Sequence, residues 1–79
     1  MEVEIYSKDR CIFCDKAKIK LQKYNPKILM LDKDYTRNDF FAKFPNAKTF
    51  PQIIINEIHI GGYADLKKWF DENDLDENF

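Results

Sequence analysis

The sequence has few of the features that stabilise or localise many small proteins. Its 79 residues include two cysteines, two glycines and three prolines, and two cysteines are too few for the disulfide framework of a small secreted domain. No apolar run approaches the roughly 20 residues that a membrane-spanning helix needs. Residues 1–4 lack the basic stretch before an apolar segment that is typical of a signal peptide. We therefore expect a cytoplasmic protein that does not enter a membrane.

The sequence also lacks an excess of either charge. Thirteen basic and fourteen acidic side chains give a formal net charge of −1, so nothing favours binding to the phosphates of a nucleic acid. Acidic residues are concentrated at 71–79, which we expect to be a solvated helix end and a frayed terminus. Hydrophobic residues make up 44% of the chain and aromatic residues 15%, which excludes a disordered protein. We predict one small domain over residues 1–79, and a monomer.

The spacing of apolar residues predicts alternating strands and helices. The predicted elements are a strand at 3–6, a helix at 11–24, a strand at 28–31, a short helix following a capping box at 36–39, strands at 52–55 and 58–60, and a helix at 63–70. The two residues between the last two strands make a connection of hairpin length. The continuous apolar run at 28–31 is typical of a strand covered on both faces. We predict an α/β fold with a mixed four-stranded sheet and three helices, in the order β-α-β-α-β-β-α.

The two cysteines stand three positions apart, where the first strand gives way to the first helix. The first amides of a helix lack internal partners, and its N-terminus carries about half a positive charge. A thiolate is stabilised at such a position. Cys14 shares an apolar stripe with Ala17 and Leu21, which predicts a buried and less reactive thiol. We therefore predict a redox dithiol in which Cys11 is the nucleophile and Cys14 the resolving thiol.

A zinc module is the alternative interpretation of a Cys-x-x-Cys pair. Structural zinc takes four ligands, and the remaining histidine or cysteine in the chain is a single His59, far along the sequence. A Cys-x-x-Cys pair beside a strand–helix–strand pattern is more typical of redox proteins. We therefore expect no metal site.

Three segments of the chain resemble those of glutaredoxins, in the same order and at suitable spacings. Residues 8–14 (Lys-Asp-Arg-Cys-Ile-Phe-Cys) resemble the family's basic residue three positions before a CPYC-type site. Residues 49–52 (Thr-Phe-Pro-Gln) resemble its Thr-Val-Pro-Gln segment, which contains a cis proline. Residues 59–66 (His-Ile-Gly-Gly-Tyr-Ala-Asp-Leu) resemble the Gly-Gly-x-x-Asp segment that opens the last helix. The resemblance covers nearly the full length of the chain.

The resemblance implies a thioredoxin-like fold and an enzyme that reduces disulfides with glutathione as co-substrate and no permanently bound cofactor. Its clients would be proteins with disulfides or glutathionylated thiols, with ribonucleotide reductase a candidate by family analogy only. The residues implied to bind glutathione are Lys8, Phe13, Thr49, Phe50, Pro51, Gly62, Tyr63 and Asp65.

The implied contacts have a physical basis. The backbone of Phe50 would pair with the cysteinyl unit of glutathione like an added strand. Amides of Gly62 and Tyr63, at a helix start, would meet the γ-glutamyl carboxylate. Asp65 would accept the ammonium group, and Lys8 would meet the glycyl carboxylate.

The chain departs from the family pattern at three positions, and two further functions stay open. Ile12 and Phe13 replace the usual proline and tyrosine between the cysteines, and Phe50 replaces a smaller aliphatic residue.

One alternative function is that of a protein that holds an iron–sulfur cluster between two chains through Cys11 and glutathione, which loss of the proline favours. The other is a redoxin that thioredoxin reductase reduces, which the apparent glutathione-binding residues oppose.

Overall fold

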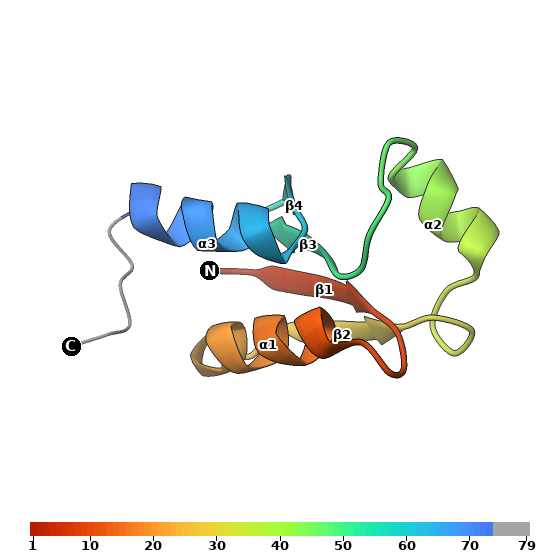
Figure 1. The fold of residues 1–79 in the computed structure, drawn as a ribbon, viewed down its shortest axis with the longest axis horizontal. Helices are drawn as coiled ribbons and strands as arrows, with labels where there is room; N and C mark the ends of the chain where they lie inside the picture. The colour runs from red at the N-terminus through yellow and green to blue at the C-terminus, as the bar shows by residue number, and fades with distance from the viewer. Residues whose placement is uncertain (74–79) are drawn as a thin grey trace.

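The computed structural model describes residues 1–73, and positions 74–79 of the acidic segment expected to be a frayed terminus lie outside the described residues. In chain order the elements are β1 (Val3–Ser7), α1 (Ile12–Leu21) with a 3₁₀ turn (Gln22–Tyr24), β2 (Lys27–Met30), α2 (Arg37–Lys43), β3 (Gln52–Ile55), β4 (Ile58–Gly61) and α3 (Tyr63–Glu72), as Figure 1 shows. This order confirms the predicted β-α-β-α-β-β-α sequence of elements. Within the described residues, no helix has the length and apolar character that a membrane span requires.

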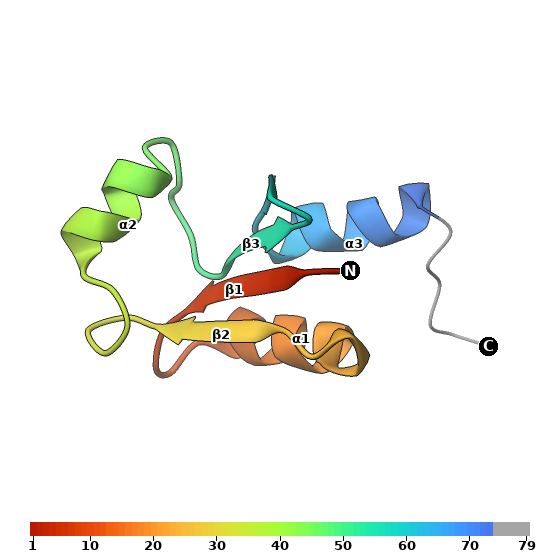
Figure 2. The same ribbon diagram turned by 180° about the vertical axis from the view of Figure 1, so that it is seen from behind.

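The four strands form one mixed sheet in the order β2-β1-β3-β4. Strand β1 is parallel to β2 and antiparallel to β3, and β4 runs antiparallel to β3 (Figure 2). The hairpin between β3 and β4 turns at Asn56 and Glu57, whose φ angles of 51° and 68° are both left-handed. A type I′ turn requires this conformation at both central residues. The predicted two-residue hairpin is therefore confirmed.

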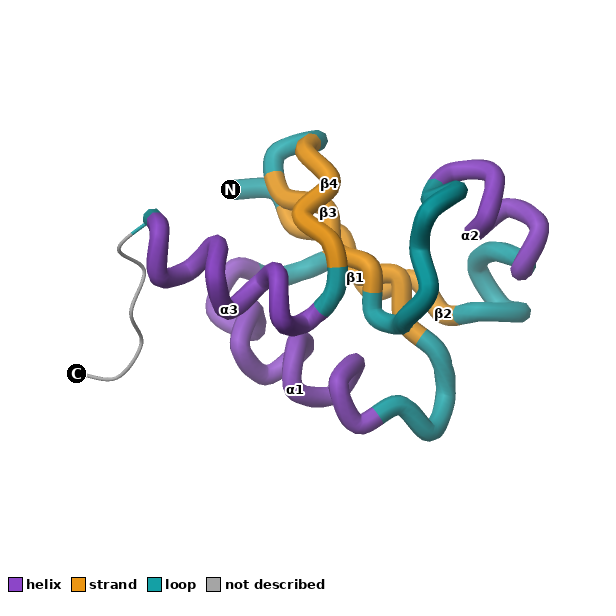
Figure 3. The backbone as a smooth tube through the Cα atoms, turned by 45° about the horizontal axis from the view of Figure 1, so that its top comes forward, coloured by secondary structure: helices purple, strands orange, loops and turns teal. Residues whose placement is uncertain are grey.

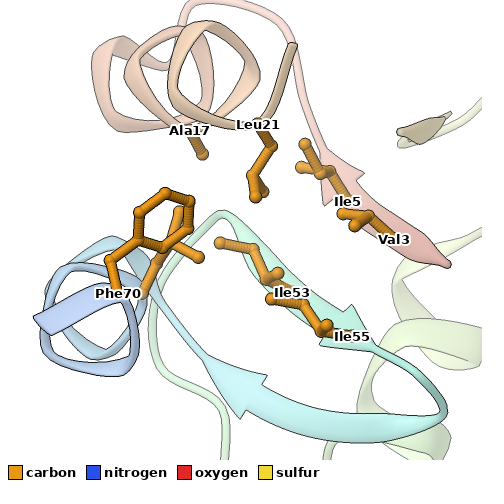
Figure 4. Close-up of a cluster of buried hydrophobic side chains, with 8 residues drawn as sticks. Val3, Ile5, Ala17, Leu21, Ile53, Ile55 and Phe70 are labelled. Atoms are coloured by element: carbon orange, nitrogen blue, oxygen red, sulfur yellow. The ribbon is translucent and has the colours of Figure 1, made fainter. Parts of the chain in front are cut away.

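Helices α1 and α3 lie side by side on one face of the sheet, and the main core lies beneath them (Figures 3 and 4). The alternation of β1 and β3 directs apolar side chains to this face, where they meet the apolar stripes of the two helices. Its buried residues, each at most 4% exposed, are Val3, Ile5, Ala17, Leu21, Ile53, Ile55, Leu66 and Phe70. Each large side chain buried here stabilises the fold by about 1.5–3 kcal/mol. This core holds both helices against the sheet.

A second cluster lies on the opposite face of the sheet, around α2. Phe40 and Phe44 pack there with Tyr35, next to Tyr6 of β1. Hydrogen bonds of 3.1 Å in both directions between Thr36 and Asp39 begin α2, as the predicted capping box requires. The buried Tyr35 hydroxyl donates to the carbonyl of Ser7 at 2.6 Å. Burial raises the pKa of Tyr35 to about 12.

Strand β2 differs from its prediction. It lies at the edge of the sheet, and Ile28 is 38% exposed. Leu29 packs against the second cluster but is only partly buried. The reason is that the short helix α2 lies beyond the end of β1 in Figures 1 and 2 and leaves much of that face open. The prediction of a strand covered on both faces is therefore wrong.

Candidate active site

Cys11 is the N-cap of α1. Its backbone is extended, with φ −130° and ψ 103°, and its Sγ accepts a hydrogen bond from the amide of Cys14 at 3.1 Å. A sulfur atom thus takes the position that a serine or aspartate oxygen takes at most helix starts. The amide hydrogen bond and the helix dipole would both stabilise negative charge on this sulfur.

The two cysteines form a disulfide with their Cα atoms 5.2 Å apart, within the usual range for such a bond. Cys14 is completely buried, whereas Cys11 is partly exposed. Next to them, Ile12 and Phe13 are 71% and 53% exposed. The predicted asymmetry, with an accessible first sulfur and a buried second one, is confirmed.

The segment before β3 carries the predicted cis bond, between Phe50 and Pro51. Buried Gln52 holds this segment from behind, because its Nε2 donates to the carbonyl of Thr49 at 2.9 Å. That bond leaves Gln52 Oε1 to accept from Nε2 of His59, at 2.7 Å. Gln52 lies within one of the three resembling segments, but the resemblance implied no role for it. The available signal was a polar residue at the start of an otherwise apolar strand.

The start of α3 lies directly against this segment. Gly62 is its N-cap, and the Oδ2 atom of Asp65 accepts the amide of Gly62 at 3.0 Å. A Cβ atom at Gly62 would lie 3.2 Å from Oγ1 of Thr49. At Gly61, where φ is +121°, a Cβ atom would overlap the carboxylate of Asp65. The backbone conformation of Gly61 therefore requires glycine, whereas a side chain at Gly62 would need Thr49 to shift by a few tenths of an ångström.

A groove of about 420 Å³ runs between these segments. It is lined by Phe13, Lys16, Thr49, Phe50, Gly62, Tyr63, Ala64, Asp65 and Lys67. The rings of Phe13 and Tyr63 lie 5.8 Å apart and join the starts of α1 and α3. In Figure 1 both helices run in the same direction, and their starts lie on the side of each helix that is nearer to α2. The first residue of the chain that lines the groove is Phe13, two residues after Cys11.

The groove contains six of the eight residues that the resemblance assigned to glutathione binding. The other two adjoin it: Lys8 Nζ lies 5.5 Å from the centre of the Phe50 ring, and the carbonyl of Pro51 faces Gly62. Lys16 and Lys67 line the groove but were not predicted. The signal for them was spacing, because they follow Phe13 and Tyr63 by three and four residues on their helices.

One of the expected contacts changes in detail. The amide of Gly62 already donates to Asp65, so the start of α3 offers the amide of Tyr63 and the one after it to a ligand. His59 lies against Gln52 and the ring of Phe44. In residues 1–73, no group of three or more potential ligand side chains is placed to hold a metal ion.

Comparison with known proteins identifies the family. The family model described as Glutaredoxin matches residues 3–60. Glutaredoxin 3 of Escherichia coli is 36% identical over 66 residues, which cover 81% of this chain and 80% of that protein. The chain belongs to the glutaredoxin family. This glutaredoxin is therefore a thiol–disulfide oxidoreductase whose Cys-x-x-Cys pair can form a disulfide.

Solved structures agree with this assignment. Glutaredoxin 1 of Francisella tularensis superposes with a TM-score of 0.76 at 27% identity, covering 95% of this chain and 98% of that one. A buckwheat glutaredoxin in complex with glutathione also gives a TM-score of 0.76, at 20% identity and with 92% and 71% of the two chains covered. These likenesses confirm the thioredoxin-like fold of the glutaredoxin.

Proposed function

We propose that this glutaredoxin uses glutathione to reduce protein disulfides and the mixed disulfides that glutathione forms with protein thiols. The observation that carries the proposal is the combination of two features at one end of the molecule. The sulfur of Cys11 caps α1, and the adjoining groove brings together six residues that the glutaredoxin resemblance assigns to glutathione.

The difference between the two cysteines supports a defined order of steps. The thiolate of Cys11 attacks one sulfur of the client disulfide, the client S–S bond breaks, and the released client sulfur takes up a proton. Cys14 then loses its proton and attacks Cys11, which releases the second client thiol and forms the Cys11–Cys14 disulfide. The client gains two electrons and the enzyme dithiol loses two. The partly exposed Cys11 and the buried Cys14 suit these roles.

Glutathione would restore the dithiol in two exchanges. A first glutathione thiolate attacks Cys11 and frees Cys14 as a thiol. A second glutathione attacks the sulfur of the bound one, so that glutathione disulfide leaves and Cys11 is again reduced. Two glutathione molecules together supply the two electrons. A glutathionylated client needs only Cys11, which attacks the glutathione sulfur and releases the client thiol.

The walls of the groove offer groups that match glutathione. The amide of Tyr63, at the N-terminus of α3, would donate to the γ-glutamyl carboxylate. Asp65 uses Oδ2 for Gly62, which leaves Oδ1 for the ammonium group. Lys8 lies over the ring of Phe50, from which its flexible side chain would reach the glycyl carboxylate.

The test is steady-state reduction of a small glutathione mixed disulfide with glutathione, glutathione reductase and NADPH. A parallel reaction replaces glutathione and its reductase with thioredoxin reductase. We expect turnover in the first reaction and none in the second. Turnover only with thioredoxin reductase would reject glutathione dependence while leaving the dithiol chemistry intact. Turnover in neither would reject the oxidoreductase mechanism proposed here.

A further inference from the structure

The groove is more basic than the protein that contains it. The whole chain has a formal net charge of −1, yet Lys16 and Lys67 line the groove from α1 and α3. Among the described residues that line it, Asp65 is the one acid, and one of its oxygens accepts the amide of Gly62. The positive charge is therefore a local property of this surface.

The arrangement of the helices adds to this local charge. Helices α1 and α3 run in the same direction, so that their N-termini lie on the same side (Figures 1 and 3), and a helix N-terminus carries a partial positive charge. Asp15 lies in the first turn of α1 and opposes part of that charge, but it does not line the groove. The lining of the groove therefore has two lysines and one acid, next to two helix starts.

Between the two lysines lies an apolar surface. The rings of Phe13 and Tyr63 are 5.8 Å apart, and Lys16 Nζ lies 5.5 Å from the centre of the Phe13 ring. Ile12, the residue directly after the reactive Cys11, is 71% exposed. A polypeptide held by Cys11 therefore meets apolar side chains with a cation on either helix.

The contacts proposed for glutathione leave these lysines unassigned. They come from Phe13, from the segment around Phe50, from the start of α3 and from Lys8. Lys16 and Lys67 lie further along their helices, three and four residues beyond Phe13 and Tyr63. Neither lysine is among the residues assigned to glutathione, so their charges can meet a second partner, the client polypeptide.

We propose that Lys16 and Lys67 form a docking surface for an acidic segment of the client, next to its disulfide-bonded or glutathionylated cysteine. The proposal rests on the proposed function, because it concerns the client of that same reaction. Complementary charges speed the encounter of two partners and select between competing ones. Clients with Asp or Glu beside the reactive cysteine are therefore reduced faster than otherwise identical clients without them.

The experiment compares two glutathionylated synthetic peptides of the same length. One carries glutamates on both sides of its cysteine, and the other carries glutamines at the same positions. Initial rates are measured with glutathione, glutathione reductase and NADPH, for the wild type, for the double variant Lys16→Gln/Lys67→Gln, and for Lys68→Gln. Lys68 is an exposed neighbour on α3 that does not line the groove, so its variant controls for loss of charge alone.

The wild type is expected to favour the acidic peptide about three- to tenfold in kcat/KM at low ionic strength, from two exposed ion pairs. Added salt should shrink this ratio. The double variant should bring the ratio near one, and Lys68→Gln should keep it. Equal rates for both peptides with the wild type, an unchanged ratio in the double variant, or an equal loss in Lys68→Gln would overturn the docking surface.

Failure of the proposed function would be seen separately. A small mixed disulfide of glutathione and a non-peptide thiol is reduced in the same assay. If the wild type fails to turn it over with glutathione, the proposed function itself is rejected and the docking surface with it. Normal turnover of that substrate together with no preference between the peptides rejects the docking surface alone.

Discussion

Replacing Asp65 by asparagine separates its two roles. In the wild type the amide of Gly62 donates to Oδ2 of Asp65 at 3.0 Å. Asparagine keeps an oxygen that can accept this hydrogen bond, but it removes the negative charge. The first turn of α3 loses a favourable interaction with the helix dipole, which costs about 0.3–1 kcal/mol of stability. The proposed ion pair with the ammonium group of glutathione is lost as well. For an exposed carboxylate we assign this pair about 1 kcal/mol, or about fivefold in kcat/KM for glutathione.

Asp39 provides a matched control. It occupies the same third position in α2, where its Oδ2 accepts the amide of Thr36 at 3.1 Å, and it does not line the groove. Asp39→Asn should therefore lower stability by a similar amount. Its kcat/KM for glutathione should stay at the wild-type value. Urea unfolding measures the first quantity, and the coupled glutathione reductase assay measures the second.

The comparison of the two variants decides between binding and structure. If Asp65→Asn and Asp39→Asn lose the same stability and only Asp65→Asn loses kcat/KM, the carboxylate of Asp65 contacts glutathione. If Asp65→Asn keeps the wild-type kcat/KM over a range of glutathione concentrations, the carboxylate only caps α3. That result would refute the assignment of the ammonium group to Asp65.

Three further substitutions test the supports of the site and the core. Gln52→Leu removes the bond to the carbonyl of Thr49 and should raise the KM for glutathione several-fold with little change in kcat; an unchanged KM would show that the cis-proline segment needs no such support. Tyr35→Phe removes the bond to Ser7 and should cost about 1 kcal/mol near pH 7, seen as a fall of about 4–8 °C in Tm. Burial raises the pKa of Tyr35 to about 12, so the folded state favours its neutral form. The contribution of Tyr35 to the free energy of unfolding is complete below pH 10 and is lost as the pH rises through 12. Urea unfolding should detect this loss in the wild type and not in the variant. Leu66→Ala empties a fully buried position and should cost about 2–5 kcal/mol by urea unfolding, a loss below 1 kcal/mol being incompatible with the packed core.

The features that sequence predicted best are those with a local cause. The capping box at Thr36 and Asp39 needs only residues three apart, and the turn at Asn56 and Glu57 needs only the two residues that adopt it. The dithiol is also local, because the N-cap position of Cys11 follows from where the helix begins. Each of these three features depends only on residues that are close in the chain, so it could be predicted from the sequence alone.

The features that sequence reasoning missed depend on contacts between distant elements. Ile28 belongs to an apolar run, yet it pairs with Ile5 on the edge strand β2, where it is 38% exposed beside the end of α1. Gln52 has a second partner in His59, which β4 brings beside it. Lys16 and Lys67 share one groove only because α1 and α3 begin at the same end of the sheet. No local pattern reports such proximity.

The central claim is that Cys11 carries the exchange with glutathione while Cys14 resolves it. The most direct measurement is the initial rate at which Cys11→Ser and Cys14→Ser reduce a small glutathione mixed disulfide with glutathione, glutathione reductase and NADPH. Since this substrate needs only the exposed sulfur, Cys14→Ser should retain turnover and Cys11→Ser should lose it. Turnover that survives in Cys11→Ser, or that disappears in Cys14→Ser alone, would contradict the account.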